Sequence, residues 1–75
     1  MNKAIANAMK AAARRAEKAA IKAGEEDPEL IRAAMEEAME EVWFTRKGVN
    51  AEENQCAALD SEEWNEAAEV LERYL

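Results

Sequence analysis

The sequence predicts an all-α protein, a small helical bundle of three helices with the third broken near Asp60, equivalent to four helices with a short third one. Three observations predict this class. Glycine and proline together account for only three of 75 residues, aromatic residues make up 5%, and no stretch has the β-branched and aromatic residues of a strand. Apolar residues recur at helical spacing through most of the chain. A chain of this length forms one domain, residues 1–75.

The first helix is predicted from Lys3 to about Ala23. Asn2 is a suitable N-cap, and Gly24 stands where a left-handed residue ends a helix. Its inward residues alternate spacings of four and three, as in a heptad seam; they are Ile5, Met9, Ala12, Ala16, Ala19, Ala20 and Ala23. Because most are alanine, a neighbouring backbone can approach closely. This Ala-rich face could therefore also support self-association.

The second helix has the clearest start. Asp27 can accept a hydrogen bond from a free backbone N–H, and Pro28 suits the first helical position. The helix is expected to end near Lys47, before Gly48. Its predicted inward stripe is Ile31, Ala34, Met35, Ala38 and Val42, with Leu30, Met39, Trp43 and Phe44 alongside.

The C-terminal third is predicted to hold a short helix over about 51–59 and a last helix that reaches the C-terminus. Asn50 with Glu53 forms one capping-box pattern, and Asp60 with Glu63 forms a second. The second pattern coincides with a possible hydrophobic staple between residues 59 and 64. The inward stripe of the last helix is Trp64, Ala67, Ala68, Leu71, Tyr74 and Leu75.

Charge is segregated along the chain. Residues 1–24 hold six Lys or Arg and one Glu, whereas residues 49–75 hold eight acids and one Arg. A basic ridge on the first helix is expected to pair with acidic faces of the second and last helices, or alternatively to bind a partner; it consists of Lys10, Arg14, Lys18 and Lys22. The net charge of −7 disfavours nucleic-acid binding and favours solubility. No apolar run approaches the ~20 residues of a membrane span, so we expect no membrane partner.

The residue types exclude most catalytic chemistries. There is no histidine, and the one cysteine, Cys56, has acids nearby and no base that would lower its thiol pKa. We expect Cys56 to be a small packing residue. No glycine-rich phosphate loop and no calcium-loop pattern is present, so the sequence predicts no metal, no cofactor and no enzymatic activity.

Three aromatic residues are the candidate contacts for a partner or a pocket: Trp43, Phe44 and Trp64. Adjacent helical residues point about 100° apart, so one of Trp43 and Phe44 can enter the core while the other faces a second surface. One interpretation has these side chains packed over one end of the bundle. The other has them line a ligand pocket or anchor a partner.

The stretches "EEDPELIRAAMEEAMEEVW", "AARRAEKAAIKAG" and "SEEWNEAAEVLERYL" resemble computationally (de novo) designed small α-helical bundle proteins. The shared traits are Asp-Pro-Glu helix starts, glycine stops, alanine-packed interiors and dense Glu/Lys/Arg surfaces. The resemblance implies a structural or scaffold role with no natural enzymatic activity. The alternative is a small acidic protein-binding module or inhibitor, which would use an acidic face and an aromatic anchor.

Overall fold

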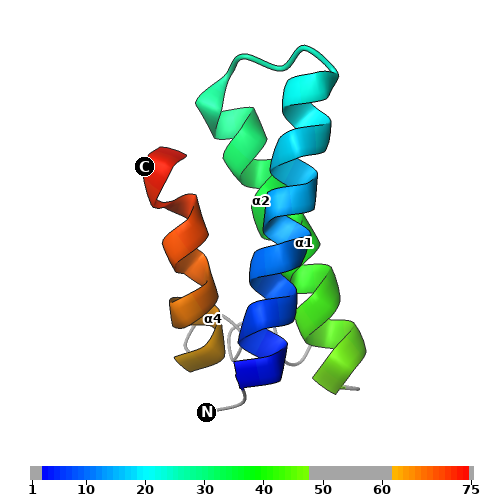
Figure 1. Cartoon of the computed structure of the whole chain (residues 1–75), viewed down its shortest axis with the longest axis vertical. Coiled ribbons are helices and arrows are strands. Elements are labelled where there is room, and N and C mark those ends of the chain that lie inside the picture. Colours follow the sequence, from blue (N-terminus) through cyan, green and yellow to red (C-terminus); the bar gives the residue numbers. More distant parts are fainter. Residues whose placement is uncertain (1–2, 48–61, 75) are drawn as a thin grey trace.

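The computed structural model describes residues 3–47 and 62–74, and every element within them is helical. Helix α1 spans Lys3–Lys22, α2 spans Pro28–Lys47, α4 spans Glu62–Ala67, and the 3₁₀ helix η1 spans Ala68–Tyr74. α1 and α2 form an antiparallel pair, and α4 with η1 runs along one side of it (Figure 1). The predicted all-α bundle is confirmed. The predicted break near Asp60, the short helix over 51–59 and Cys56 lie outside the described residues.

The turn that ends α1 forms as the sequence predicts, around Gly24. Its φ of 92° lies in the left-handed region. The N–H of Gly24 donates to the carbonyl of Ile21 at 3.0 Å, and the N–H of Glu25 donates to the carbonyl of Ala20 at 3.0 Å. These two bonds form a Schellman motif, which satisfies carbonyls that the helix end would leave free.

Replacing Gly24 with alanine is expected to destabilise the fold by about 1 kcal/mol, because an L side chain is strained at this φ. A Cβ added there would meet no atom within 4 Å, so the cost comes from the backbone alone. Urea unfolding of Gly24→Ala and Gly24→Asn checks this, since asparagine tolerates the left-handed region better. Equal stability of the alanine variant and the parent chain would contradict the assignment.

The start of α2 is also confirmed. The Asp27 side chain accepts a hydrogen bond from the N–H of Glu29 at 2.9 Å. The backbone carbonyl of Asp27 accepts hydrogen bonds from the N–H groups of Leu30 and Ile31, both at 3.1 Å. Asp27 is therefore the N-cap, and Pro28 occupies the first helical position, where its missing N–H costs nothing.

The core is formed by one row of side chains from each helix. α2 contributes residues four apart, and α1 and the C-terminal segment contribute smaller sets. The members of this core are Ile5, Met9, Ala13, Ile31, Met35, Met39, Trp43, Trp64, Ala67 and Leu71. The largest side chains that are fully buried are Met9, Met35 and Met39. Methionine is flexible and fills the irregular space that alanine neighbours leave.

Part of the predicted inward stripes is wrong. Ala19 of α1 and Ala23, which follows the end of α1, are exposed. Leu30, which was expected beside the α2 stripe, is 54% exposed. A heptad row drifts by about 20° per heptad around a straight helix, so the later members of the predicted α1 row leave the core face. In α2 the buried row steps through Met39 and Trp43, which the sequence placed alongside the stripe.

The C-terminal segment changes from α-helix to 3₁₀ geometry at Ala68. The sequence predicted a single last helix, and its inward positions Trp64, Ala67 and Leu71 are indeed buried. In a 3₁₀ helix residues three apart align, so Ala68, Leu71 and Tyr74 share one face toward α1 and α2. Apolar spacings of three and four fit both helix types, so the sequence pattern did not distinguish them.

Candidate functional site

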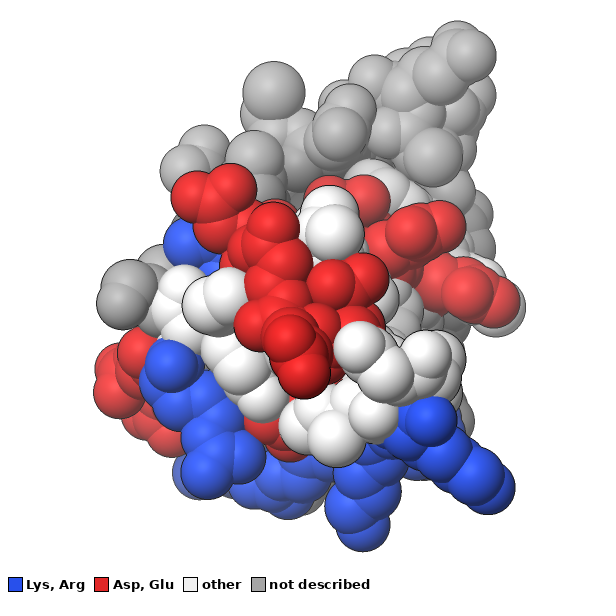
Figure 2. Space-filling model, turned by 90° about the horizontal axis from the view of Figure 1, so that it is seen from above, with Lys and Arg blue, Asp and Glu red and all other residues white. Residues whose placement is uncertain are grey.

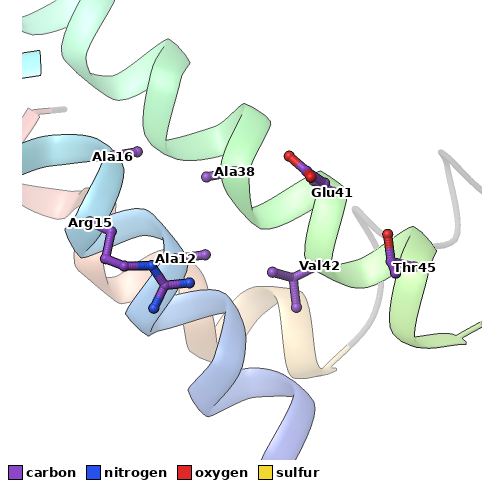
Figure 3. Close-up of a pocket in the computed structure, with 7 residues that line it drawn as sticks. All are labelled: Ala12, Arg15, Ala16, Ala38, Glu41, Val42 and Thr45. Carbon is purple, nitrogen blue, oxygen red and sulfur yellow. The ribbon is translucent and has the colours of Figure 1, made fainter. Parts of the chain in front are cut away.

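A groove runs between α1 and α2 and encloses about 430 Å³ (Figure 3). α1 contributes Ala12, Arg15 and Ala16. α2 contributes the remaining lining residues, which are Ala38, Glu41, Val42 and Thr45. The floor is made of small apolar side chains, and two charged side chains, Arg15 and Glu41, stand at its edges.

The groove lies on the side of α1 away from the C-terminal segment. Lys10 and Glu17 of α1 reach toward α4 and η1 through ion pairs with Glu66 and Arg73. Arg15 points about half a turn away from Glu17 around the helix. α4 and η1 therefore cover one face of the α1–α2 pair, and the groove occupies another.

The hollow exists because alanine occupies both helices where they pass each other. Interaxial distance depends on the side chains at the contact, and small residues here leave a gap beside the core rather than a filled layer. Ala12 is buried, while Ala16 and Ala38 are half-buried. A side chain from another molecule could reach these residues without displacing any core residue.

The two edges of the groove carry opposite charges. Arg15 and Glu41 are both exposed. Neither has an ion-pair partner among the side chains of residues 3–45 and 62–74. The groove thus combines an apolar floor with one exposed positive charge and one exposed negative charge at its edges.

The three aromatic residues singled out in the sequence lie elsewhere. Trp43 and Trp64 are 5% and 6% exposed and belong to the same core cluster. Phe44 is half-buried and packs against that cluster. None of the three lines the groove. The groove itself was not predicted. Its signal in the sequence is alanine on two facing helices, flanked by opposite charges.

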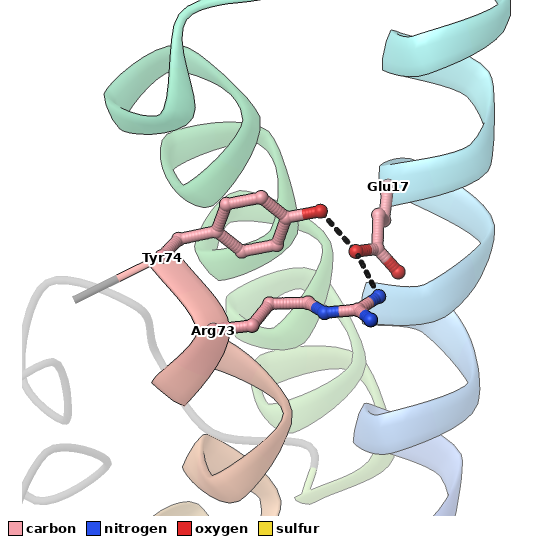
Figure 4. Close-up of polar contacts among 3 residues, drawn as sticks. All are labelled: Glu17, Arg73 and Tyr74. Atoms are coloured by element: carbon pink, nitrogen blue, oxygen red, sulfur yellow. Dashed lines mark hydrogen bonds and ion pairs between the residues drawn. The ribbon is translucent and has the colours of Figure 1, made fainter.

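A second polar cluster joins η1 to the middle of α1 (Figure 4). One carboxylate oxygen of Glu17, Oε2, accepts a hydrogen bond from Arg73 Nη1 at 3.1 Å and another from the Tyr74 hydroxyl. The Tyr74 hydrogen bond, assisted by Arg73, lowers the pKa of the Glu17 carboxyl. The same bond to Glu17 raises the pKa of the Tyr74 phenol. The cluster holds the end of η1 against α1.

These pKa directions predict a stability that falls at both pH extremes. The Glu17 contribution is present above the unfolded carboxyl pKa and is lost as pH falls through the lowered folded value. The Tyr74 contribution is present below the unfolded phenol pKa and is lost as pH rises through the raised folded value. We expect a plateau from about pH 5 to about pH 9.

Denaturant unfolding of the parent chain, Tyr74→Phe and Glu17→Gln across pH tests this expectation. The phenylalanine variant should lose the alkaline fall and show a smaller acid fall. Glu72→Gln is the matched control, because Glu72 is an exposed acid on η1, the helix that carries Tyr74. If the control changed the acid limb as much as Glu17→Gln, the cluster would not be the cause.

Glu66 of α4 sits between two lysines of α1. Its Oε1 lies 3.8 Å from Lys3 Nζ and 3.7 Å from Lys10 Nζ. Of the predicted basic ridge, Lys10 thus pairs with the last helix as expected. The other three residues of the ridge have no carboxylate within 4.0 Å among the described side chains; they are Arg14, Lys18 and Lys22.

The end of the bundle that carries the α1–α2 turn shows the same segregation of charge (Figure 2). Acidic side chains gather in the middle of this face and basic ones lie along one side. Residues 25–27 of the turn are all acidic, whereas the exposed charged side chains in the second half of α1 are basic. The net charge of −7 therefore conceals a positive surface along α1.

The described residues contain no grouping of three or more acidic, histidine or cysteine side chains that could hold a metal ion. Among the described helices, none combines the length and apolar character that crossing a membrane requires. No protein-family model, curated protein or solved structure matches this chain.

Proposed function

We propose that the protein is a helical scaffold that binds a protein partner through the α1–α2 groove and carries out no chemical reaction. The observation that carries this proposal is the open apolar groove with exposed charges of opposite sign on its two edges. A covalent or acid–base role is not favoured by the groove lining. Its charged groups are one guanidinium and one carboxylate at its edges, and its floor is alanine and valine.

A partner helix suits this surface. Helix-in-groove recognition places an apolar helix face against an apolar channel, with charges at the edges fixing orientation. The alanine floor allows close approach of a second backbone. The buried positions of Trp43 and Trp64 do not favour an aromatic anchor on this chain.

Photo-crosslinking in cells that express the chain tests the proposal. A benzophenone amino acid replaces Thr45, an exposed residue that lines the groove, or Glu72, an exposed residue of η1, as the matched control. We expect one discrete crosslinked product from position 45 and none from position 72. Equal crosslinking from both positions, or none from position 45, would contradict the proposed binding surface.

A further inference from the structure

We propose that the partner in the α1–α2 groove is a second copy of this chain, related by a two-fold axis parallel to α1 and α2. This inference rests on the proposed function, because it names the occupant of the same groove. Closed two-fold dimers are the commonest assemblies of soluble proteins and bring the same patch of both copies together.

The two-fold axis determines which helices meet. An axis parallel to the helices places α1 of one copy on α2 of the other and leaves each residue at its height along the bundle. Arg15 and Glu41 line the same hollow, so they lie at similar heights. Arg15 of each copy therefore comes opposite Glu41 of the other, and the symmetry makes this contact twice.

The other face-to-face arrangement is disfavoured by charge. A two-fold axis that crosses the helices at right angles places α1 on α1 and brings two basic surfaces together. On the groove side of α1, Arg15 and Lys22 lie seven residues apart and are both exposed, so this contact would bring like charges together. The segregated charges of the chain thus select the arrangement in which α1 meets α2.

Exposed apolar residues extend the groove beyond its hollow. On α1, Ala19 follows Ala12 by seven residues and is exposed. Ala23 follows Ala16 by seven residues, just after the end of α1, and is also exposed. On α2, Leu30 is 54% exposed and precedes Glu37 and Glu41 by seven and eleven residues, so it lies on their side of the helix. A second copy in the groove would cover these side chains. In a single chain, Ala19 and Ala23 of the predicted alanine row are exposed. In the dimer, apolar side chains of the second copy would cover them.

The size of the molecule allows such an interface. A stable interface buries about 800 Å² on each partner, which is roughly one-sixth of the 4958 Å² accessible surface. The core is small: in the part of the chain that the structure describes, the three largest fully buried side chains are all methionine, and four of the twelve buried residues are alanine. A chain of this length gains stability from association that its own core does not supply.

Charge reversal with mixing tests the inference. Sedimentation equilibrium first measures dimerisation of the parent chain, then of Arg15→Glu and Glu41→Arg. Each variant alone places like charges at both contacts, and we expect its dimer to dissociate about tenfold more readily. An equimolar mixture should recover the parent affinity, because each contact of the mixed dimer again joins opposite charges. If Arg15 and Glu41 paired only within one chain, mixing the two variants would not restore the dimer affinity.

Arg14→Glu and Glu40→Arg are the matched controls. They make the same charge changes next to the test positions but do not line the groove, and mixing them should recover no affinity. Ala19→Arg is a further variant at an exposed position; it should weaken dimerisation while circular dichroism shows an unchanged fold. A parent chain that stays monomeric, or a mixture no tighter than its components, overturns the inference.

The two proposals fail in different ways. If the parent chain is monomeric but position 45 still crosslinks to a protein of another mass, the second copy is wrong and the groove remains a binding surface. If position 45 gives no product at all, the binding surface itself is wrong.

Discussion

Replacing Met39 with alanine is expected to lower the free energy of unfolding by about 2–5 kcal/mol. Met39 is fully buried and lies between Met35 and Trp43 on the row that α2 contributes to the core. A chain of 75 residues has a total stability of about 4–11 kcal/mol. The truncation therefore removes a large share of that stability and lowers the melting temperature by at least about 10 °C.

Thermal and urea unfolding measure this loss at one low protein concentration, because association would add stability. Met39→Leu is the conservative control and should cost less than about 1.5 kcal/mol, since it nearly conserves volume. Glu37→Ala, at an exposed position of the same helix, should have little effect. A Met39→Ala cost as small as that of Glu37→Ala would show that this row is not the centre of the core.

Replacing Trp64 with alanine is expected to cost about 3–5 kcal/mol. Trp64 is 6% exposed and attaches α4 to the cluster that contains Trp43 and residues of α1. One core is shared by all the described helices, so its loss should destabilise all of them together. Hydrogen exchange should show reduced protection in α1 and α2 as well as in α4 and η1.

Trp64→Phe is the matched control, because it keeps an aromatic ring in the core and should retain most of the protection. Loss of protection confined to α4 and η1, with α1 and α2 as protected as in the parent chain, would contradict a single shared core. The result also tests the assignment of residues 1–75 to one domain.

The sequence could predict the helices because their ends depend on local chemistry. Gly24 ends α1 through its own φ, and Asp27 begins α2 through a hydrogen bond to a residue two positions away. Neither feature depends on where other helices lie. Such local signals survive in a single sequence, so the class of the fold and the ends of the α1–α2 connection were predicted correctly.

Helix orientation and the groove depend on packing between helices and could not be predicted in the same way. The predicted α1 row included Ala19 and Ala23. α2 and the C-terminal segment pack on the face of α1 that carries the start of this row, so the two alanines at its end are exposed. Alanine fits both a core and a surface, so composition did not separate the two. The groove appears only when Ala16 and Ala38 are placed beside each other across two helices.

The aromatic residues show the same limit. Trp43 and Trp64 suggested a surface contact or pocket, because large apolar side chains near helix ends serve either role. α4 and η1 pack against α1 and α2, and both tryptophans lie in the resulting core. The ion pair and hydrogen bond of Glu17 with Arg73 and Tyr74 join residues 56 and 57 positions apart, a pairing that local sequence patterns do not encode.

Amide nitrogen–proton correlation spectra of the parent chain over a range of concentrations test the binding role of the α1–α2 groove most directly. We expect the signals of Ala12, Ala16, Ala38 and Val42 to shift with concentration, whereas those of Glu69 and Glu72 on η1 stay fixed. Shifts centred on α4 and η1, or spectra that do not change with concentration, would contradict the self-association that this groove is proposed to mediate.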